Sequence, residues 1–344
     1  MAPPRPAGRV TASAGPLPDL RDARAWIVTD GKAGDENQCI GIAETLGLSF
    51  ELRHVAGRAP FAWLSPWGPV DPRDAPGRPG GALAGPLPDL LIASGRRAVP
   101  ALRAVRRASG GRTFTAFMKD PRTGARSADF IWLPDYDDLR GPNVLTTPTP
   151  PHRVTPERLA AARAEPDRRL AALPQPRVAV LVGGDSRHLR FGKDDVARLL
   201  ANLRRLSEDG ASLMLTVSRR TTPALRSALQ ALAVERQGFL WDGRGDNPYV
   251  AMLALADAVV VTSDSANMVG ESVCTGAPVL LFDLPGTYGR HQRFFAGLAQ
   301  AGALVPFTGR LETVHYAPID ATPGIAQSLR DAYIAHQARI ASAL

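Results

Sequence analysis

The chain has 344 residues, of which 44% are hydrophobic and 22% are charged, and this balance excludes disorder, collagen or coiled coil as a description of the whole. The net charge of +8 suits an anionic partner. The charge alone does not decide whether that partner is a phosphorylated substrate, nucleic acid or an anionic membrane surface. Arginines are scattered without interleaved aromatic residues, and no helix-turn-helix or zinc-finger spacing occurs, so we predict no nucleic-acid partner.

The two cysteines and the apolar runs bear on the compartment. Cys39 and Cys274 are far apart and form no CxxC pair, which predicts neither a disulfide nor a zinc ribbon. Both lie among apolar residues, so we expect buried thiols in a reducing compartment. No apolar run approaches the roughly 18 residues that cross a bilayer, and the basic, proline-rich start lacks a signal-peptide core. We therefore expect a cytoplasmic protein with a disordered tail at residues 1–22.

The first half alternates strand-like and helix-like segments. Residues 25–30 predict a strand and 31–35 a loop, and apolar side chains at helical spacing from Cys39 to Leu46 predict a helix that Gly47 ends. A loop insertion rich in proline and glycine is expected at 66–88. Further strands are predicted at 50–55, 89–93, 113–118, 129–133 and 143–146.

The alternation restarts after a proline-rich stretch. Strands are predicted at 177–182, 211–217, 238–241, 258–262 and 278–282, with helices from about 193, at 223–233, at 248–255 and at 266–275. This pattern indicates an α/β fold of two tandem doubly wound, Rossmann-like domains, each with its ligand cleft at the carboxyl ends of its strands. We expect domains at 23–150 and 177–320, a linker at 151–176 and a C-terminal helix at 321–344.

Several polar residues of the second half follow predicted strands. Glycines such as Gly183 and Gly184 let backbone amides approach phosphate at a helix start, although a plain tight turn explains the pair equally well. Ser218, Arg219 and Arg220 follow another strand, where a guanidinium suits phosphate oxygens and an ordinary solvated arginine is the alternative. The phosphate-binding candidates after these two strands are Gly183, Gly184, Asp185, Ser186, Arg187, Ser218 and Arg219.

The stretch 262–271 leaves a strongly apolar strand through small hydroxyl and amide residues. Glu271 lies further along the expected helix, where a carboxylate can bind ribose hydroxyls. The alternative is a simple helix N-cap at Ser263, Asp264 or Ser265, and both interpretations are compatible. The nucleotide-binding candidates here are Asp264, Ser265, Asn267, Met268 and Glu271.

The first half offers candidates for acceptor chemistry at residues 30–38. Asp35 is either a general base for an acceptor hydroxyl or a helix N-cap. The P-loop pattern is absent, which argues against ATP hydrolysis. The acceptor-side candidates are Gly31, Lys32, Gly34, Gln38, Arg96 and Lys119, with Ser94, Gly95 and Asp120 also expected near the cleft.

Motifs of other enzyme classes are missing. Neither HExxH nor HxH occurs, the six histidines are dispersed, and GxSxG is absent. We also expect no DxD metal motif, and this expectation is what favours metal independence. We therefore expect no metal site, no cofactor and no serine hydrolase. GxGxxG is absent as well, so a dinucleotide fingerprint is not predicted.

Five ordered motifs resemble the mitochondrial-fission, or elongated-mitochondria, family, which is similar to GT-B glycosyltransferases. They are TrpIleValThrAspGlyLysAlaGlyAspGluAsnGln (26–38), GlyProAsnValLeuThrThr (141–147), ValGlyGlyAspSerArgHis (182–188), TrpAspGlyArgGlyAspAsnProTyr (241–249) and ValValThrSerAspSerAlaAsnMetValGlyGlu (260–271). The resemblance covers roughly residues 24–320.

The resemblance implies a nucleotide-sugar in the second domain and an acceptor in the first. Gly183, Gly184, Ser265 and Glu271 match the GT-B pattern of a glycine-rich turn and a downstream Glu for the ribose. The expected activity is that of an inverting, metal-independent glycosyltransferase with a cell-envelope lipid or lipopolysaccharide precursor as acceptor, peripheral on an inner membrane. The alternative is a scaffold that keeps the fold and recruits a protein partner, since plant members are known as recruiters of fission machinery.

Overall fold

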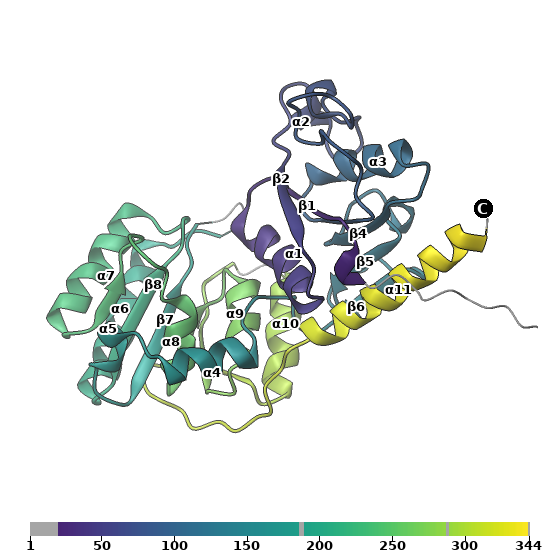
Figure 1. The fold of residues 1–344 in the computed structure, drawn as a ribbon. Coiled ribbons are helices and arrows are strands. Elements are labelled where there is room, and N and C mark those ends of the chain that lie inside the picture. Colours follow the sequence, from purple (N-terminus) through teal and green to yellow (C-terminus); the bar gives the residue numbers. More distant parts are fainter. Residues whose placement is uncertain (1–19, 186–188, 287–288, 343–344) are drawn as a thin grey trace, which may run out of the picture.

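The computed structural model describes residues 20–185, 189–286 and 289–342. Within them the chain forms two parallel six-stranded sheets with helices on both faces (Figure 1). The predicted α/β fold of two tandem doubly wound domains is confirmed. The predicted tail lies outside the described residues up to residue 19, whereas Leu20–Asp22 form a 3-10 helix (η1) whose Leu20 is buried.

The first domain has the strand order β2-β1-β3-β4-β5-β6, with every neighbouring pair parallel. Its strands are β1 (Ala25–Thr29), β2 (Phe50–His54), β3 (Leu90–Ala93), β4 (Phe114–Met118), β5 (Phe130–Pro134) and β6 (Val144–Thr147). Its helices are α1 (Ala33–Thr45), α2 (Phe61–Leu64) and α3 (Ala98–Ala108), with 3-10 turns η2 (Pro72–Asp74) and η3 (Ala125–Ser127).

Alternation along the strands gives this sheet two apolar faces. Ile27 of β1 packs towards α1, whereas its neighbours Trp26 and Val28 pack towards α3. Because successive strand side chains point to opposite faces, a continuous apolar run is what a sheet covered on both sides requires. The predicted strands match within one residue at each end.

The second domain is also a parallel six-stranded sheet, but its strand order is β12-β11-β10-β7-β8-β9. Its strands are β7 (Arg177–Val182), β8 (Ser212–Val217), β9 (Phe239–Trp241), β10 (Ala258–Thr262), β11 (Val279–Phe282) and β12 (Leu304–Pro306). Its helices are α6 (Lys193–Glu208), α7 (Pro223–Glu235), α8 (Tyr249–Leu255), α9 (Ala266–Val273) and α10 (Gly289–Gln300). The order reverses between β7 and β10, which places the switch point there.

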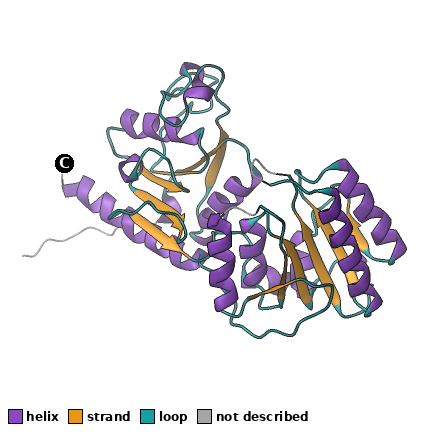
Figure 2. Cartoon of the chain, turned by 180° about the vertical axis from the view of Figure 1, so that it is seen from behind, coloured by secondary structure: helices purple, strands orange, loops and turns teal. Residues whose placement is uncertain are grey.

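Two segments connect the domains. The expected linker contains α4 (Pro156–Ala164) and α5 (Arg168–Ala171), and both pack on α8 of the second domain. The final helix α11 (Thr322–Ser342) returns to the first domain and packs against α1 and strands β4 to β6 (Figures 1 and 2). The chain therefore crosses between the domains twice, and the carboxyl ends of the two sheets are held near each other.

Cys39 and Cys274 are both buried and free, as expected. Burial raises the pKa of the Cys39 thiol well above its ordinary value, and nearby Asp35 adds to the effect. Both thiols therefore stay protonated at neutral pH, which suits a packing role. No helix in the described part of the chain is long and apolar enough to span a bilayer.

Candidate functional site

The carboxyl ends of β7, β8 and β10 converge on the carboxylate of Asp264. This side chain is fully buried, and it accepts hydrogen bonds from the Gly184 amide at 3.0 Å and from the Thr262 hydroxyl at 2.7 Å. Arg220 Nη2 lies 2.6 Å from Asp264 Oδ2 and forms an ion pair with it. Three donors thus satisfy one buried charge, as burial of a carboxylate requires.

The two glycines of the β7 turn are explained by this packing. A Cβ on Gly183 would lie 2.0 Å from Asp264 Oδ2, and one on Gly184 would lie 2.2 Å from the Arg220 carbonyl carbon. The Gly183 amide donates to Thr262 Oγ1 at 2.9 Å, so both amides that we expected to face a phosphate already donate within the domain. The tight-turn interpretation therefore accounts for both glycines in this structure.

The neighbouring candidates on β7 and β8 have mixed placements. Asp185 Oδ1 accepts from the Phe191 amide at 3.0 Å, and Ser218 Oγ accepts from the Arg220 amide at 3.1 Å. Arg219 is exposed, whereas the side chain of Arg220 reaches Asp264, at the centre of the carboxyl edge of this sheet. Of the predicted residues, Ser186 and Arg187 lie outside the described part of the chain.

Helix α9 begins at this edge. Ser265 is its N-cap and accepts from the Met268 amide at 3.4 Å, which confirms the capping interpretation. Met268 packs against the apolar core, so its side chain serves the interior of the domain. The unpaired amides of a helix start carry positive potential, which favours an anion.

Glu271 lies one turn further along α9 and is partly buried. The Tyr249 hydroxyl, at the start of α8, donates to Glu271 Oε2 at 2.5 Å. Burial raises the pKa of Glu271 to about 7, partly offset by this hydrogen bond. The carboxyl therefore populates both protonation states near neutral pH and can accept or donate a hydrogen bond to a hydroxyl ligand.

The corresponding edge of the first domain is built around Asp35. This buried carboxylate lies in the first turn of α1 and pairs with Lys119 Nζ at 2.9 Å. The N-cap of α1 is Lys32, whose side chain makes no capping hydrogen bond, so the interpretation of Asp35 as the N-cap is wrong. A Cβ on Gly95 would lie 3.2 Å from Asp30 Oδ1 and 3.3 Å from Asp35 Oδ2, so the two carboxylates are close neighbours.

Hydrogen-bond acceptors remain available at this first edge. Asp30 pairs with Lys32 through Oδ2 at 2.6 Å, whereas Asp30 Oδ1 and Gln38 Oε1 are buried and accept no hydrogen bond from the described residues. Unsatisfied buried acceptors are rare and call for a donor. Gly31 has a φ of +79°, which suits the sharp exit from β1, and Arg96 is exposed in the turn after β3.

The two edges touch through α1 and α9. Gln38 Nε2 donates to Asn267 Oδ1 at 3.0 Å, and a Cβ on Gly34 would lie 2.7 Å from Asn267 Nδ2. The helix starts of the two domains therefore face each other across a close contact. This brings together Gly34, Asp35 and Gln38 from the predicted acceptor side with Asn267 from the predicted donor side.

A second bridge comes from the start of α10. Arg290 pairs with Asp137 of the first domain at 2.7 Å, and the ring of His291 packs edge-on against Tyr136 at 6.4 Å between centroids. Burial lowers the pKa of His291, although Asp264 opposes this, so the imidazole is neutral at neutral pH. A neutral imidazole between the domains can accept a proton.

Sequence reasoning missed Asp30, Tyr249 and His291. Asp30 directly follows β1, which is a signal that could have identified it, because the carboxyl ends of strands form the cleft. His291 has a weaker signal of the same kind, since it follows β11 after a longer turn. Tyr249 carries no local signal, because its role depends on the packing of α8 against α9.

The expectation that the chain has no DxD motif is wrong, because one pair of acidic residues has this spacing. Asp135 and Asp137 flank Tyr136 and have DxD spacing. Asp137 is engaged by Arg290, and burial raises the pKa of both carboxyls. No group of three His, Cys, Asp or Glu among the described residues is arranged to hold a metal ion.

Two doubly wound parallel domains that meet at the carboxyl ends of their sheets define the GT-B class. A model of the family described as mitochondrial fission ELM1 matches residues 33–333, and the chain belongs to this family. It is 25% identical to the mitochondrial fission protein ELM1 of Arabidopsis thaliana, over 89% of this chain and 90% of that protein. It is 26% identical to the uncharacterized protein RP120 of Rickettsia prowazekii, over 44% of this chain and 45% of that protein.

Solved structures align over most of the chain at low identity. One is a UDP-GlcNAc 2-epimerase of Neisseria meningitidis bound to UDP-GlcNAc, with a TM-score of 0.49, 10% identity, and coverage of 90% of this chain and 93% of that one. Another is a UDP-glucosyltransferase of Polygonum tinctorium, with a TM-score of 0.47, 13% identity, and coverage of 93% and 98%.

Proposed function

We propose that the chain is an inverting, metal-independent glycosyltransferase that uses a nucleotide-diphospho-sugar. The observation that carries the proposal is the contact between the two edges. The paired Asp35 of one domain and the start of α9 of the other lie on either side of the Gln38–Asn267 hydrogen bond. A base for an acceptor hydroxyl and an anion-binding helix start are the two groups that sugar transfer needs.

The donor belongs to the second domain in this proposal. Glu271 binds a ribose hydroxyl, and the diphosphate lies towards the start of α9 with Arg219 or Arg220 nearby. Because the Gly183 and Gly184 amides donate internally, phosphate contacts fall to the helix start and the arginines. Arginine offers the paired donors that phosphate oxygens accept.

The acceptor belongs to the first domain. Asp35 takes the proton of the acceptor hydroxyl as its oxygen forms a bond to the anomeric carbon of the sugar. The bond from that carbon to the diphosphate oxygen breaks, and the electron pair leaves with the nucleoside diphosphate. Asp30 Oδ1 and Gln38 Oε1 support this placement, since both are acceptors that a sugar or lipid hydroxyl can satisfy.

His291 is a second group for proton transfer. Its neutral imidazole faces both domains, whereas Asp35 is ion-paired with Lys119. The variants Asp35→Asn and His291→Asn distinguish these two candidates for the general base. The variant that lacks the true general base is expected to have a kcat about 100-fold or more below that of wild type. The other variant changes kcat much less.

We propose metal independence because of how the carboxylates of Asp135 and Asp137, the pair with DxD spacing, are engaged. The Asp137 carboxylate is held by Arg290 at 2.7 Å, which leaves it poorly placed to bind a cation. Turnover that is unchanged by a chelator supports this part of the proposal, and turnover that a chelator abolishes and Mg²⁺ or Mn²⁺ restores contradicts it.

A thermal-shift screen with UDP, GDP, CMP and ADP tests the nucleotide part of the proposal. At a ligand concentration 100 times Kd, one-site binding stabilises the fold by about 2.7 kcal/mol, which is a readily measured change in Tm. At least one nucleotide is expected to raise Tm. No shift with any of them, and no release of nucleoside diphosphate from any nucleotide-sugar, overturns the proposal.

A non-catalytic scaffold is the second candidate, favoured by the Arabidopsis relative that is named for mitochondrial fission. A scaffold predicts no turnover of any nucleotide-sugar, and its role is recruitment of a protein to a membrane. Nucleotide binding together with turnover excludes it.

For the enzyme we propose a lipid acceptor at the cytoplasmic face of an anionic inner membrane.

A further inference from the structure

Large apolar side chains are exposed together at α2 of the first domain. Trp63, Leu64 and Trp67 expose 76%, 49% and 66% of their surface, whereas the neighbouring small residues Ala62 and Ser65 are buried. This segment therefore turns its large side chains to solvent and its small ones inward, the reverse of ordinary packing. Figure 1 shows α2 at the top of the first domain, away from the second domain.

The exposed segment is held firmly by the body of the domain. Arg103 of α3 donates from Nη2 to the carbonyls of Pro66, Trp67 and Gly68, at 2.9, 2.9 and 2.7 Å. Three carbonyls on one guanidinium fix the turn that carries Trp67. The tryptophans are thus displayed on a rigid support.

The positive charge of the chain is concentrated in the stretch of sequence that contains this segment. Residues 56–127 contain twelve Lys and Arg against four Asp and Glu, a net charge of +8, which equals that of the whole chain. The remaining residues are therefore balanced, with 29 basic and 29 acidic side chains. An acidic or phosphate-bearing partner would be drawn to this part of the surface.

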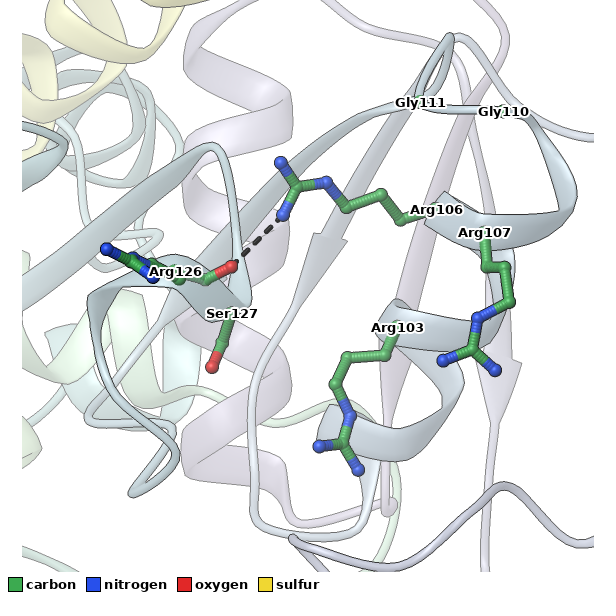
Figure 3. Close-up of a pocket in the computed structure, with 7 residues that line it drawn as sticks. All are labelled: Arg103, Arg106, Arg107, Gly110, Gly111, Arg126 and Ser127. Carbon is green, nitrogen blue, oxygen red and sulfur yellow. Dashed lines mark hydrogen bonds between the residues drawn. The ribbon is translucent and has the colours of Figure 1, made fainter.

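Four of these arginines surround a surface depression of about 360 Å³ (Figure 3). Arg103 lines the depression and also holds the tryptophan turn, so the two features are continuous. Arg106 pairs with Asp129 at 2.8 Å, which balances its charge, while Arg107 and Arg126 are exposed.

We propose that this surface, formed by Trp63, Leu64 and Trp67 with Arg103, Arg107 and Arg126, docks on a bilayer that contains anionic phospholipid. Indole rings favour the boundary between headgroups and acyl chains, and arginines bind lipid phosphates beside it. Three exposed apolar side chains are too few for the core of a stable protein interface, yet they suffice for shallow insertion. The surface places the lipid acceptor of the proposed function near the enzyme, but docking does not require transfer activity.

Vesicle flotation tests the proposal on the full chain. The probes are vesicles of phosphatidylcholine alone and of phosphatidylcholine mixed with phosphatidylglycerol. Wild type is expected to float with the anionic vesicles and to stay unbound with the neutral ones, with binding that weakens as salt rises. Equal binding to both, or no binding to either, overturns the proposal.

Two pairs of variants assign the binding to this surface. Trp63→Ser with Trp67→Ser is compared with Val234→Ser, which alters a side chain that is 72% exposed on α7 of the other domain. Arg107→Gln with Arg126→Gln is compared with Arg205→Gln with Arg244→Gln, which removes the same charge from the second domain. The tryptophan variant is expected to weaken anionic-vesicle binding about tenfold or more, because it removes the two indole rings that insert at the headgroup boundary. The arginine variant is expected to weaken it about tenfold or more, because it removes two positive charges from the surface that faces the anionic lipid.

The controls are expected to bind as wild type does. A control that weakens binding as much as its partner variant contradicts the assignment, as does a tryptophan variant that floats normally. Unchanged Tm and an unchanged response to nucleotide show that each variant is folded. These readouts also separate a failure of docking from a failure of the proposed transfer activity.

Discussion

The carboxyl edges of the two sheets are both formed by six parallel strands, but they have opposite hydrogen-bonding states. In the second domain the buried Asp264 has three donors, and the Gly183 and Gly184 amides are used within the domain. In the first domain Asp30 and Gln38 keep buried acceptors without a donor from the described residues. A glycine turn after a strand can therefore serve the packing of the domain alone, and buried acceptors that lack a donor indicate more about a ligand than such a turn does.

This difference between the two edges changes which groups are expected to contact the nucleotide. The second edge retains Glu271, the start of α9 and an exposed Arg219 as groups that can meet a ligand. The first edge retains acceptors beside a carboxylate–lysine pair. We therefore expect substitutions at the centre of the second edge, such as those of Asp264, to lower mainly the stability of the fold. Substitutions at its rim, such as those of Glu271, are expected to weaken mainly nucleotide binding.

The largest expected effect is the loss of the Asp264 carboxylate. Asp264→Ala leaves the buried Gly184 amide without its acceptor and Arg220, whose side chain is 39% exposed, without its partner, so a loss of about 3 kcal/mol is expected. Asp35→Ala frees Lys119, whose side chain is 54% exposed, so about 1 kcal/mol is expected. Urea unfolding of both variants gives the comparison. Equal losses would show that the two edges are equally dependent on their carboxylates.

The glycines give the next largest effect. Gly184→Ala forces a Cβ to within 2.2 Å of backbone and is expected to cost about 2 kcal/mol. Gly31→Ala meets nothing closer than His54 at 4.0 Å, so only its φ of +79° matters, at about 1 kcal/mol. Midpoints of chemical unfolding measure both. A Gly31 variant that is less stable than the Gly184 variant contradicts this account.

The fold class and most of the second edge follow from sequence because they depend on local patterns. Strands such as β7 and β10 are continuous apolar runs, and Ser265 caps a helix where a hydroxyl precedes a helical period. The Glu271–Tyr249 hydrogen bond and the His291–Tyr136 contact join residues far apart in the chain, so only tertiary packing reveals them. The internal use of the Gly183 amide likewise depends on Thr262, 79 residues away.

A pH dependence of stability is expected from Glu271. The pKa of its carboxyl is about 7 in the folded state against an ordinary value of 4.5, so the folded state binds the proton more tightly. Between these two pH values unfolding releases a proton, and the free energy of unfolding falls as pH rises through this window. Glu271→Gln should lack this component, which urea unfolding at a series of pH values measures. Identical pH profiles for wild type and variant would contradict it.

The smallest effect is expected at the contact between the edges. Gln38→Ala removes one hydrogen bond to Asn267 and should cost less than about 1 kcal/mol. Gln327→Ala, which removes an exposed hydrogen bond to Asp331 within α11, is the matched control. Faster limited proteolysis between the domains of the Gln38 variant is the readout. No difference from the control would mean that this contact does not hold the domains together.

The assignment of nucleotide to the second edge is tested most directly by calorimetric titration of the nucleoside diphosphate that gives the largest thermal shift. Glu271→Ala is expected to raise Kd about tenfold, since it removes one hydrogen bond of about 1.4 kcal/mol to a charged group. Asp35→Asn is expected to leave Kd unchanged within about twofold, because it alters only the acceptor side by this account. Weakened binding in Asp35→Asn with normal binding in Glu271→Ala would contradict the assignment.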